Sequence, residues 1–425
     1  MLELSTMKTK RILYPASVTD TRIRAPKSKN HYYVLACLIL FLALAAVYVH
    51  AALIKPLPMV SFASKTVTLP ASTQPVTPWP AGVSAGFGTT TSGVLDTSPS
   101  SEQPRSIASI AKVITALAVT QKKPLSSDAD NIITFSAADE ELYHHYAASD
   151  GSYVPIHAGD QLSEYRALEA MLLPSANNMA DSLAIWAFGS MDAYASYATN
   201  MVKSYGLKNT TITEASGFND TVLSTPSDLI VLGQKLLANT ELAQIVMQQN
   251  DTLPILGKLY NTNQLLGNGV NGIKTGHTTG AGYCLLLEKN IVIDSTHTVH
   301  AISAVLGAGS SNDSFSLSDS LIKSVQGDFG AVLIAPKNAV LGTIITPWGA
   351  RSDIVATADV NTYGWKYTAR TAQTSPLPVA GAASAGTAAG SITVKNDSGF
   401  TDSYNLVLKN SLKPPSKWWR LTHYF

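Results

Sequence analysis

The sequence predicts an α/β protein of the α+β type, preceded by a membrane-spanning helix and followed by a small all-β domain. Apolar residues recur with helical spacing over residues 106–117 and again over about 164–187, as expected for helices with one buried face. The apolar runs 283–287 and 298–306 indicate adjacent strands. Beyond about residue 336, short β-like segments are divided by Gly, Pro and Asn, which is typical of a small β domain.

The composition excludes several broad classes of protein. The 425 residues carry 30 Lys and Arg against 29 Asp and Glu, a formal charge of +1, so the chain as a whole has no electrostatic attraction to nucleic acid. Hydrophobic residues make up 45% of the chain, which excludes intrinsic disorder. The two cysteines, Cys37 and Cys284, are too few for a disulfide framework or a Cys₄ zinc site.

The N-terminal region combines a basic tail with a long uncharged segment. Residues 1–31 hold seven basic and two acidic side chains, and residues 32–54 hold none. As a helix, the 23-residue segment is about 35 Å long, enough to cross a hydrocarbon core of ~30 Å. This uncharged segment is longer than expected for a buried helix in the core of a soluble domain. A cleaved signal peptide is the stronger alternative, because small residues near Ala51 and Ala52 permit cleavage, although its apolar region is normally about 7–15 residues.

We interpret residues 32–54 as an uncleaved, single-pass transmembrane anchor in the cell membrane. The excess of basic residues before it predicts that the 1–31 tail is cytoplasmic and that everything after residue 55 is exported. Residues 55–80 contain six prolines and are expected to form an extended linker. Ordered structure is expected to begin near Val83 with a hairpin, in a domain over residues 81–330. A small β-rich domain over residues 331–425 follows.

A serine and a lysine three residues apart suggest nucleophilic catalysis. On a helix, Ser109 and Lys112 would lie one turn apart on the same face. An alcohol needs an adjacent base to become a good nucleophile at neutral pH. A lysine can be that base if desolvation or neighbouring cations lower its pKa. This spacing alone is weak evidence for catalysis. The apolar neighbours Ile107 and Ile110, however, make it unusual for the serine and lysine to be a solvent-exposed pair on the surface.

Two later segments strengthen this interpretation. Ser175 and Asn177 offer a hydroxyl and an amide two residues apart, and Lys274-Thr275-Gly276 offers a second lysine, a hydroxyl and a glycine that permits close backbone approach. Separately, the first could be a helix N-cap and the second a turn before a strand. The order Ser-x-x-Lys, Ser-x-Asn, Lys-Thr-Gly is the signature of penicillin-recognising serine enzymes.

The chain resembles the low-molecular-mass penicillin-binding proteins of the D-alanyl-D-alanine carboxypeptidase family. The resemblance rests on residues 104–112, 175–180 and 272–284, with further likeness at 215–219 and 224–228. It implies a penicillin-binding/β-lactamase-like fold: an antiparallel sheet flanked by helices, with the site between the sheet edge and a helical subdomain. The implied serine D,D-peptidase domain corresponds to the predicted domain 81–330.

The resemblance also implies roles for the motif residues. Ser109 would be the nucleophile and Lys112 the general base of acylation. Lys274 would help to keep Lys112 neutral and would bind the terminal carboxylate of the substrate, with a hydrogen bond from Thr275. Ser175 would relay a proton to the departing D-alanine, while Asn177 holds the substrate backbone.

An oxyanion hole would be formed by the backbone N–H groups of Ser109 and His277, so backbone distortion at Gly276 should be severe. No cofactor is implied. A zinc site at His144, His145 and His157 is not expected, because no His-x-x-x-His arrangement with a nearby carboxylate is present.

Several functions remain open at this level. The first is a membrane-anchored carboxypeptidase that trims the terminal D-alanine of peptidoglycan stem peptides and is acylated by β-lactam antibiotics. A D,D-endopeptidase would share its motifs. A β-lactamase would need a water-activating carboxylate, but no Glu-x-x-Leu-Asn segment lies between Asn177 and Lys274. An inactive penicillin-binding protein acting as a binding module is the remaining alternative, and a nucleic-acid partner is not expected.

Overall fold

The computed structural model describes residues 30–99, 101–125, 131–397, 399 and 401–423. The predicted basic tail, residues 1–31, therefore lies outside the described residues except for its last two positions. The chain divides into two compact units: residues 1–58 together with 414–425, and residues 59–413.

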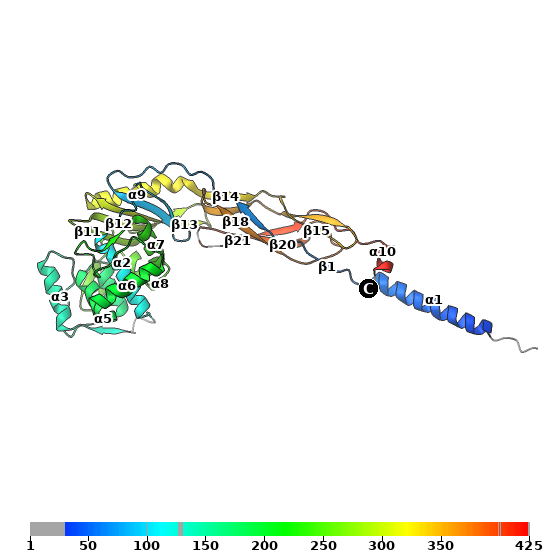
Figure 1. Cartoon of the computed structure of the whole chain (residues 1–425), viewed down its shortest axis with the longest axis horizontal. Coiled ribbons are helices and arrows are strands. Elements are labelled where there is room, and N and C mark those ends of the chain that lie inside the picture. Colours follow the sequence, from blue (N-terminus) through cyan, green and yellow to red (C-terminus); the bar gives the residue numbers. More distant parts are fainter. Residues whose placement is uncertain (1–29, 100, 126–130, 398, 400, 424–425) are drawn as a thin grey trace, which may run out of the picture. The chain divides into compact units, whose positions relative to one another are not determined.

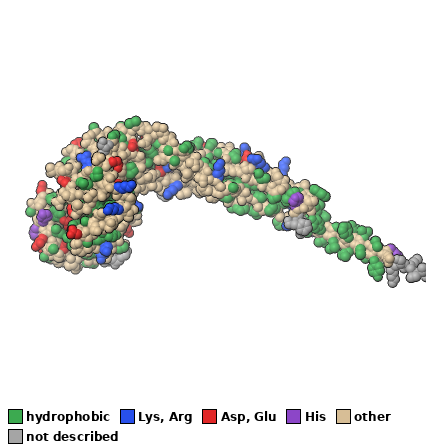
Figure 2. Space-filling model, viewed as in Figure 1, with side chains coloured by type: hydrophobic (Ala, Val, Ile, Leu, Met, Phe, Trp, Pro, Cys, Tyr) green, Lys and Arg blue, Asp and Glu red, His purple; other side chains and the backbone are tan. Residues whose placement is uncertain are grey.

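The first unit is built on one long apolar helix, α1 (Asn30–Ile54). Its length and composition are sufficient to cross a membrane, and Figure 2 shows its surface to be almost continuously hydrophobic. The short C-terminal helix α10 (Lys417–Thr422) packs against its last turns. Tyr48 donates a hydrogen bond to the Leu421 carbonyl at 2.5 Å, and Arg420 donates one to the Leu53 carbonyl at 2.8 Å. The N-terminal apolar helix expected from the sequence is therefore present.

The second unit contains a five-stranded antiparallel sheet. Its strands are ordered β11 (Val270–Thr278), β12 (Gly282–Val292), β13 (Thr298–Ala308), β3 (Ser84–Thr89) and β4 (Gly93–Thr97). The hairpin predicted near Val83 is β3–β4, and the runs predicted as adjacent strands belong to the paired β12 and β13. The positive φ of Gly93, 75°, permits the tight turn before β4. β11 is an edge strand, because β12 is its one partner in the sheet.

Helices cover both faces of this sheet (Figure 1). On one face α9 (Ser311–Val325) contributes Leu321 and Ile322 to a core with the strands. On the other face α7 (Pro226–Leu237) packs against β3 and β13. α8 (Thr240–Met247) packs against β11 on the sheet. The other helices of the helical subdomain are α2 (Ala111–Lys122), α3 (Ala137–Ala148), α4 (Glu164–Leu172), α5 (Asn177–Phe188) and α6 (Met191–Ser204).

The single helix predicted over about 164–187 is wrong, because the segment forms two helices. α4 ends at Leu172 and α5 begins at Asn177. Leu173 keeps helical backbone angles, but Pro174 has no N–H with which to continue the helical hydrogen bonds. Ser175 then adopts a left-handed backbone with φ of 66°. The break positions Ser175 and Asn177 at the start of a helix instead of inside one.

The β-rich region forms a six-stranded sheet and smaller pairings. The sheet order is β15 (Val340–Ile345), β16 (Arg351–Ala356), β21 (Thr401–Leu408), β20 (Ala388–Lys395), β18 (Arg370–Pro376) and β2 (Thr66–Leu69). β14 (Phe329–Ala335) pairs with β17 (Val360–Trp365), and β1 (Met59–Val60) pairs with β19 (Val379–Ala380).

Part of the Pro-rich segment is thus incorporated into the β-rich sheet. The β-branched run Thr66-Val67-Thr68 suits a strand, and it pairs with residues 371–373 of β18. The domain boundaries given above stay predictions. Short pairings complete the fold: β5 (Arg105–Ser106) with β8 (Leu223–Ser224), β6 (Ile132–Thr134) with β7 (Gln161–Ser163), and β9 (Asn250–Leu253) with β10 (Gly257–Tyr260).

Candidate active site

Ser109 lies in a tight 3₁₀ turn, Ala108–Ile110, directly before α2. Two glycines allow other segments to approach this turn closely. A Cβ at Gly276 would lie 2.8 Å from the Ile107 carbonyl oxygen, and a Cβ at Gly217 would lie 1.9 Å from the Ala108 carbonyl oxygen. The backbone of Ala108 is left-handed, with φ of 46°. The turn is therefore held between the Gly276 strand and the 215–218 loop, and no larger residue fits at either glycine.

Lys112 points back from α2 to the Ser109 hydroxyl. Its Nζ donates hydrogen bonds to Ser109 Oγ at 2.8 Å, to Asn177 Oδ1 at 2.7 Å and to the Ser216 carbonyl at 2.7 Å. The side chain is fully buried. Burial lowers its pKa to about 7, although the charges of Glu214 and Asp181 act in the opposite direction. The neutral amine is therefore accessible near neutral pH, in contact with the hydroxyl that would need a base.

Lys274 supplies a second buried amine from β11. Its side chain is 2% exposed, and burial followed by the Lys112 charge lowers its pKa well below the usual lysine value. Among the described residues, its Nζ has one hydrogen-bond acceptor, the Thr275 carbonyl at 3.0 Å. The remaining hydrogen-bonding positions of this amine have no partner among the described residues.

Ser175 and Asn177 come together with this pair at the break between α4 and α5. Asn177 accepts the bond from Lys112, and its backbone N–H donates to the Ser152 carbonyl at 2.7 Å. Ser175 lies on the wall of the cavity described below. Its hydroxyl makes no hydrogen bond with any residue that the structure describes, so it is available to a bound molecule.

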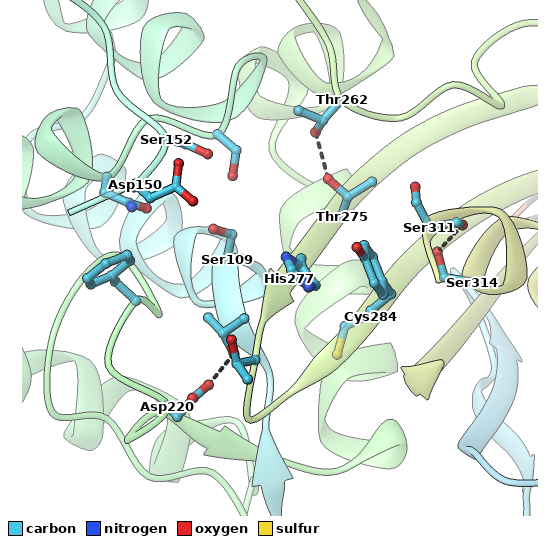
Figure 3. Close-up of a pocket in the computed structure, with 18 of the residues that line it drawn as sticks. Ser109, Asp150, Ser152, Asp220, Thr262, Thr275, His277, Cys284, Ser311 and Ser314 are labelled. Atoms are coloured by element: carbon cyan, nitrogen blue, oxygen red, sulfur yellow. Dashed lines mark hydrogen bonds between the residues drawn. The ribbon is translucent and has the colours of Figure 1, made fainter. Parts of the chain in front are cut away.

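These residues surround an open cavity of about 510 Å³ (Figure 3). Ser109, Ser175 and Asn177 contribute to it, as do Thr275, Gly276 and His277 of β11. The Thr275 and Thr262 hydroxyls lie 2.6 Å apart. The His277 ring stacks on Tyr283 with its centroid 3.9 Å away. All eight site residues expected from the sequence are therefore at this cavity or, for Lys112 and Lys274, buried directly behind it.

A buried polar network behind Lys112 was not anticipated from the sequence. Tyr146 donates to Asp181 Oδ2 at 2.6 Å, and Glu214 Oε2 accepts from the Ser216 N–H at 2.6 Å. Burial raises the pKa of Asp181 to about 6. Asp181 follows Asn177 by four residues and so shares its helix face. That spacing is the one signal that could have indicated it.

The described residues contain no group of three or more His, Cys, Asp and Glu side chains that could hold a metal ion. His144 and His157 both lie near the Glu140 carboxylate, at 3.9 and 2.9 Å, and both are exposed.

Comparison with known proteins identifies a family. A family model described as D-alanyl-D-alanine carboxypeptidase matches residues 88–310. D-alanyl-D-alanine carboxypeptidase DacC of Escherichia coli is 27% identical over 222 residues, 51% of this chain and 54% of that protein. A D-alanyl-D-alanine endopeptidase of Pseudomonas aeruginosa is 29% identical over 197 residues, 44% of this chain and 59% of that protein. The chain thus spans about half the length of the curated relatives it matches.

Solved structures confirm the fold. The Streptomyces K15 DD-transpeptidase superposes with a TM-score of 0.52 at 23% identity, covering 60% of this chain and 98% of that one. A peptidoglycan synthesis regulatory factor, PBP3, from Streptococcus pneumoniae superposes with a TM-score of 0.56 at 19% identity, covering 77% and 98%. The predicted antiparallel sheet flanked by helices is that of penicillin-binding proteins.

Proposed function

Since the chain belongs to the D-alanyl-D-alanine carboxypeptidase family, we propose that it is a serine-type carboxypeptidase that removes the terminal D-alanine of peptidoglycan stem peptides. One observation carries the proposal: a fully buried lysine amine, Lys112, lies 2.8 Å from the Ser109 hydroxyl at the wall of an open cavity. A buried lysine with a pKa near 7 is suited to take a proton from serine at neutral pH.

Acylation begins with transfer of the Ser109 proton to Lys112. Ser109 Oγ forms a bond to the carbonyl carbon between the two D-alanines, and the carbonyl oxygen becomes an anion. The backbone N–H groups of Ser109 and His277 would donate to this oxygen, and removal of one such donor typically costs about 10²–10³ in rate. The close approach of Gly276 to the Ser109 turn supports this pairing of donors.

The departing D-alanine needs a proton on its nitrogen. Ser175, whose hydroxyl is uncommitted among the described residues, is suited to relay the proton from Lys112 as the C–N bond breaks. Asn177 is held by Lys112 and by the backbone of Ser152, so its amide is fixed for a hydrogen bond to the substrate backbone. Water then hydrolyses the acyl-enzyme, with Lys112 again the base.

Recognition of the substrate would depend on β11 and Lys274. As an edge strand, β11 has backbone groups that an extended peptide can pair with. The terminal carboxylate would lie over Lys274 and Thr275. Because an anion favours the charged form of a neighbouring amine, the carboxylate would raise the lowered pKa of Lys274.

We also propose that α1 anchors the protein in the cell membrane, with the N-terminus cytoplasmic and the cavity outside the cytoplasm. The apolar length of α1 and the basic residues before it support this orientation. The packing of α10 on the end of α1 would position Trp418, which is 74% exposed, at the membrane interface, where tryptophan is favoured.

The test is D-alanine release from a pentapeptide ending in D-Ala-D-Ala by the full chain in detergent, with and without penicillin. We expect release that stops when penicillin acylates Ser109. Penicillin binding without release would contradict carboxypeptidase activity. Cleavage of a cross-linked dimer would then favour the endopeptidase alternative, which the Pseudomonas relative supports. Rapid turnover of penicillin would favour a β-lactamase. Absence of both peptide cleavage and penicillin turnover would favour an inactive binding protein.

A further inference from the structure

One carboxylate at the wall of the cavity has no partner in the described part of the chain. The charged acidic residues that line the cavity are Asp150 and Asp220. Asp220 accepts hydrogen bonds from Ser106, at 2.9 Å, and from Thr278. Asp150 makes no side-chain hydrogen bond or ion pair with any described residue, and it is exposed to the cavity.

The position of Asp150 is unfavourable for the stability of its own helix. It lies two residues beyond the end of α3 (Ala137–Ala148), where the helix dipole disfavours a negative charge. Its backbone is left-handed, with φ of 55°, a conformation that glycine and asparagine adopt more readily. Asp139 and Glu140, in contrast, lie in the first turn of the same helix, where the dipole favours them. Local rules of this kind are broken most often at functional sites.

The loop that carries Asp150 is fixed against the catalytic motif. The Gly151 N–H donates to the Tyr146 carbonyl at 2.9 Å, and the Ser152 carbonyl accepts from Asn177 at 2.7 Å. A Cβ at Gly151 would lie 2.9 Å from the Asn177 amide nitrogen. Figure 3 shows Asp150 and Ser152 across the cavity from Thr262 and Thr275. The carboxylate is thus held opposite the end of the cavity that has the buried Lys274.

We propose that Asp150 binds the side-chain amine of the residue that precedes D-Ala-D-Ala, and so selects stem peptides with a diamino acid at that position. The inference rests on the proposed function. With the substrate carboxylate over Lys274 and Thr275 and the scissile carbonyl at Ser109, the preceding residue extends toward the opposite wall, at about 3.3–3.6 Å per residue. The cavity then matches a substrate that is anionic at one end and cationic at the other.

The test compares two substrates of the full chain in detergent. One is Nα-acetyl-L-Lys-D-Ala-D-Ala with a free side-chain amine, and the other is its Nε-acetyl derivative. We expect the wild type to favour the free amine by about fivefold in kcat/KM, as for a partly exposed ion pair. We expect Asp150→Asn to reduce this ratio to about one. Asp192, an exposed acid in the first turn of α6 and not among the residues lining the cavity, provides the control Asp192→Asn, which should keep the wild-type ratio.

Two further readouts separate recognition from a structural role. The preference of the wild type should fall as salt is added, because exposed charge pairs are screened. Asp150→Asn should unfold at a temperature no lower than the wild type, since it removes a charge that the helix dipole disfavours. Equal hydrolysis of the two substrates by the wild type, or an unchanged ratio in Asp150→Asn, would overturn this inference alone. Hydrolysis of neither substrate would contradict the proposed function, and the inference with it.

Discussion

Cationic side chains are buried in two regions of the molecule, and their hydrogen-bond partners differ in charge. At the cavity, Lys112 donates to a hydroxyl, an amide oxygen and a carbonyl, all of them neutral. In the β-rich region, Arg370 donates to both oxygens of Asp397, at 2.6 and 2.7 Å. Both members of this second pair are less than 10% exposed. The Lys112 cation is buried without a bonded counter-charge, whereas the Arg370 cation is bound to a carboxylate.

The pKa values follow from this difference. Burial lowers the pKa of Lys112 to about 7, so the amine exchanges its proton near neutral pH. Burial alone would raise the pKa of Asp397, but hydrogen bonds from Arg370 and Ser92 and the Arg370 charge lower it overall. A paired buried charge is a fixed structural element, whereas an unpaired one can serve as an acid or base.

The largest expected effect is loss of catalysis at the unpaired site. Ser109→Ala should abolish acylation by penicillin and lower D-alanine release by at least about 10⁴-fold, because the nucleophile is removed. Lys112→Met should lower acylation by about 10²–10⁴-fold, the usual contribution of a general base. Both are measured with a labelled penicillin. Turnover by Ser109→Ala above a few per cent of the wild type would be incompatible with the account, provided that its unfolding transition matches the wild type.

Replacing the buried cation by methionine should affect stability much more at the Arg370–Asp397 pair than at Lys112. Arg370→Met leaves Asp397 buried without its partner and should lower the free energy of unfolding by about 3–5 kcal/mol. Lys112→Met should change it by no more than about 1 kcal/mol. Three acceptors there lose a donor, but a buried amine that resists ionisation is also removed. Denaturant unfolding of the two variants side by side measures the contrast, and equal destabilisation would refute it.

The sequence indicated the candidate catalytic residues but not their surroundings. Ser109, Lys112 and Lys274 were predicted from motif spacing, and the structure brings them to one cavity although they are far apart in the chain. The Ser216 carbonyl was not predicted, because a backbone acceptor leaves no residue-type signal. The Arg370–Asp397 pair was also missed, since both residues lie in segments predicted simply as short β structure. Pairing between distant residues depends on strand register, which side-chain periodicity alone does not fix.

The Asp397 pair predicts a smaller, acid-dependent effect. The folded pKa of Asp397 is lowered, so its contribution to stability is fully present above the unfolded value of about 3.9. It is lost as the pH falls below that value through the folded pKa. Thermal unfolding of the wild type and of Arg370→Met tests this loss of stability. It would be measured from about pH 5 to about pH 3, a range that brackets the unfolded pKa of about 3.9. The difference in stability between them should shrink as the pH falls, and a constant difference would argue against an ionised Asp397 in the pair.

The pH dependence of acylation tests the central claim most directly, that an unpaired, buried Lys112 is the base for Ser109. The second-order rate constant for acylation of the full chain by a labelled penicillin would be measured at intervals from about pH 5.5 to 9, a range centred near the titration of Lys112 at about 7. Because the base must be neutral to accept the serine proton, the rate should rise with an apparent pKa near 7 and then level off. A rate that is constant across this range, or that falls as Lys112 loses its proton, would contradict the account.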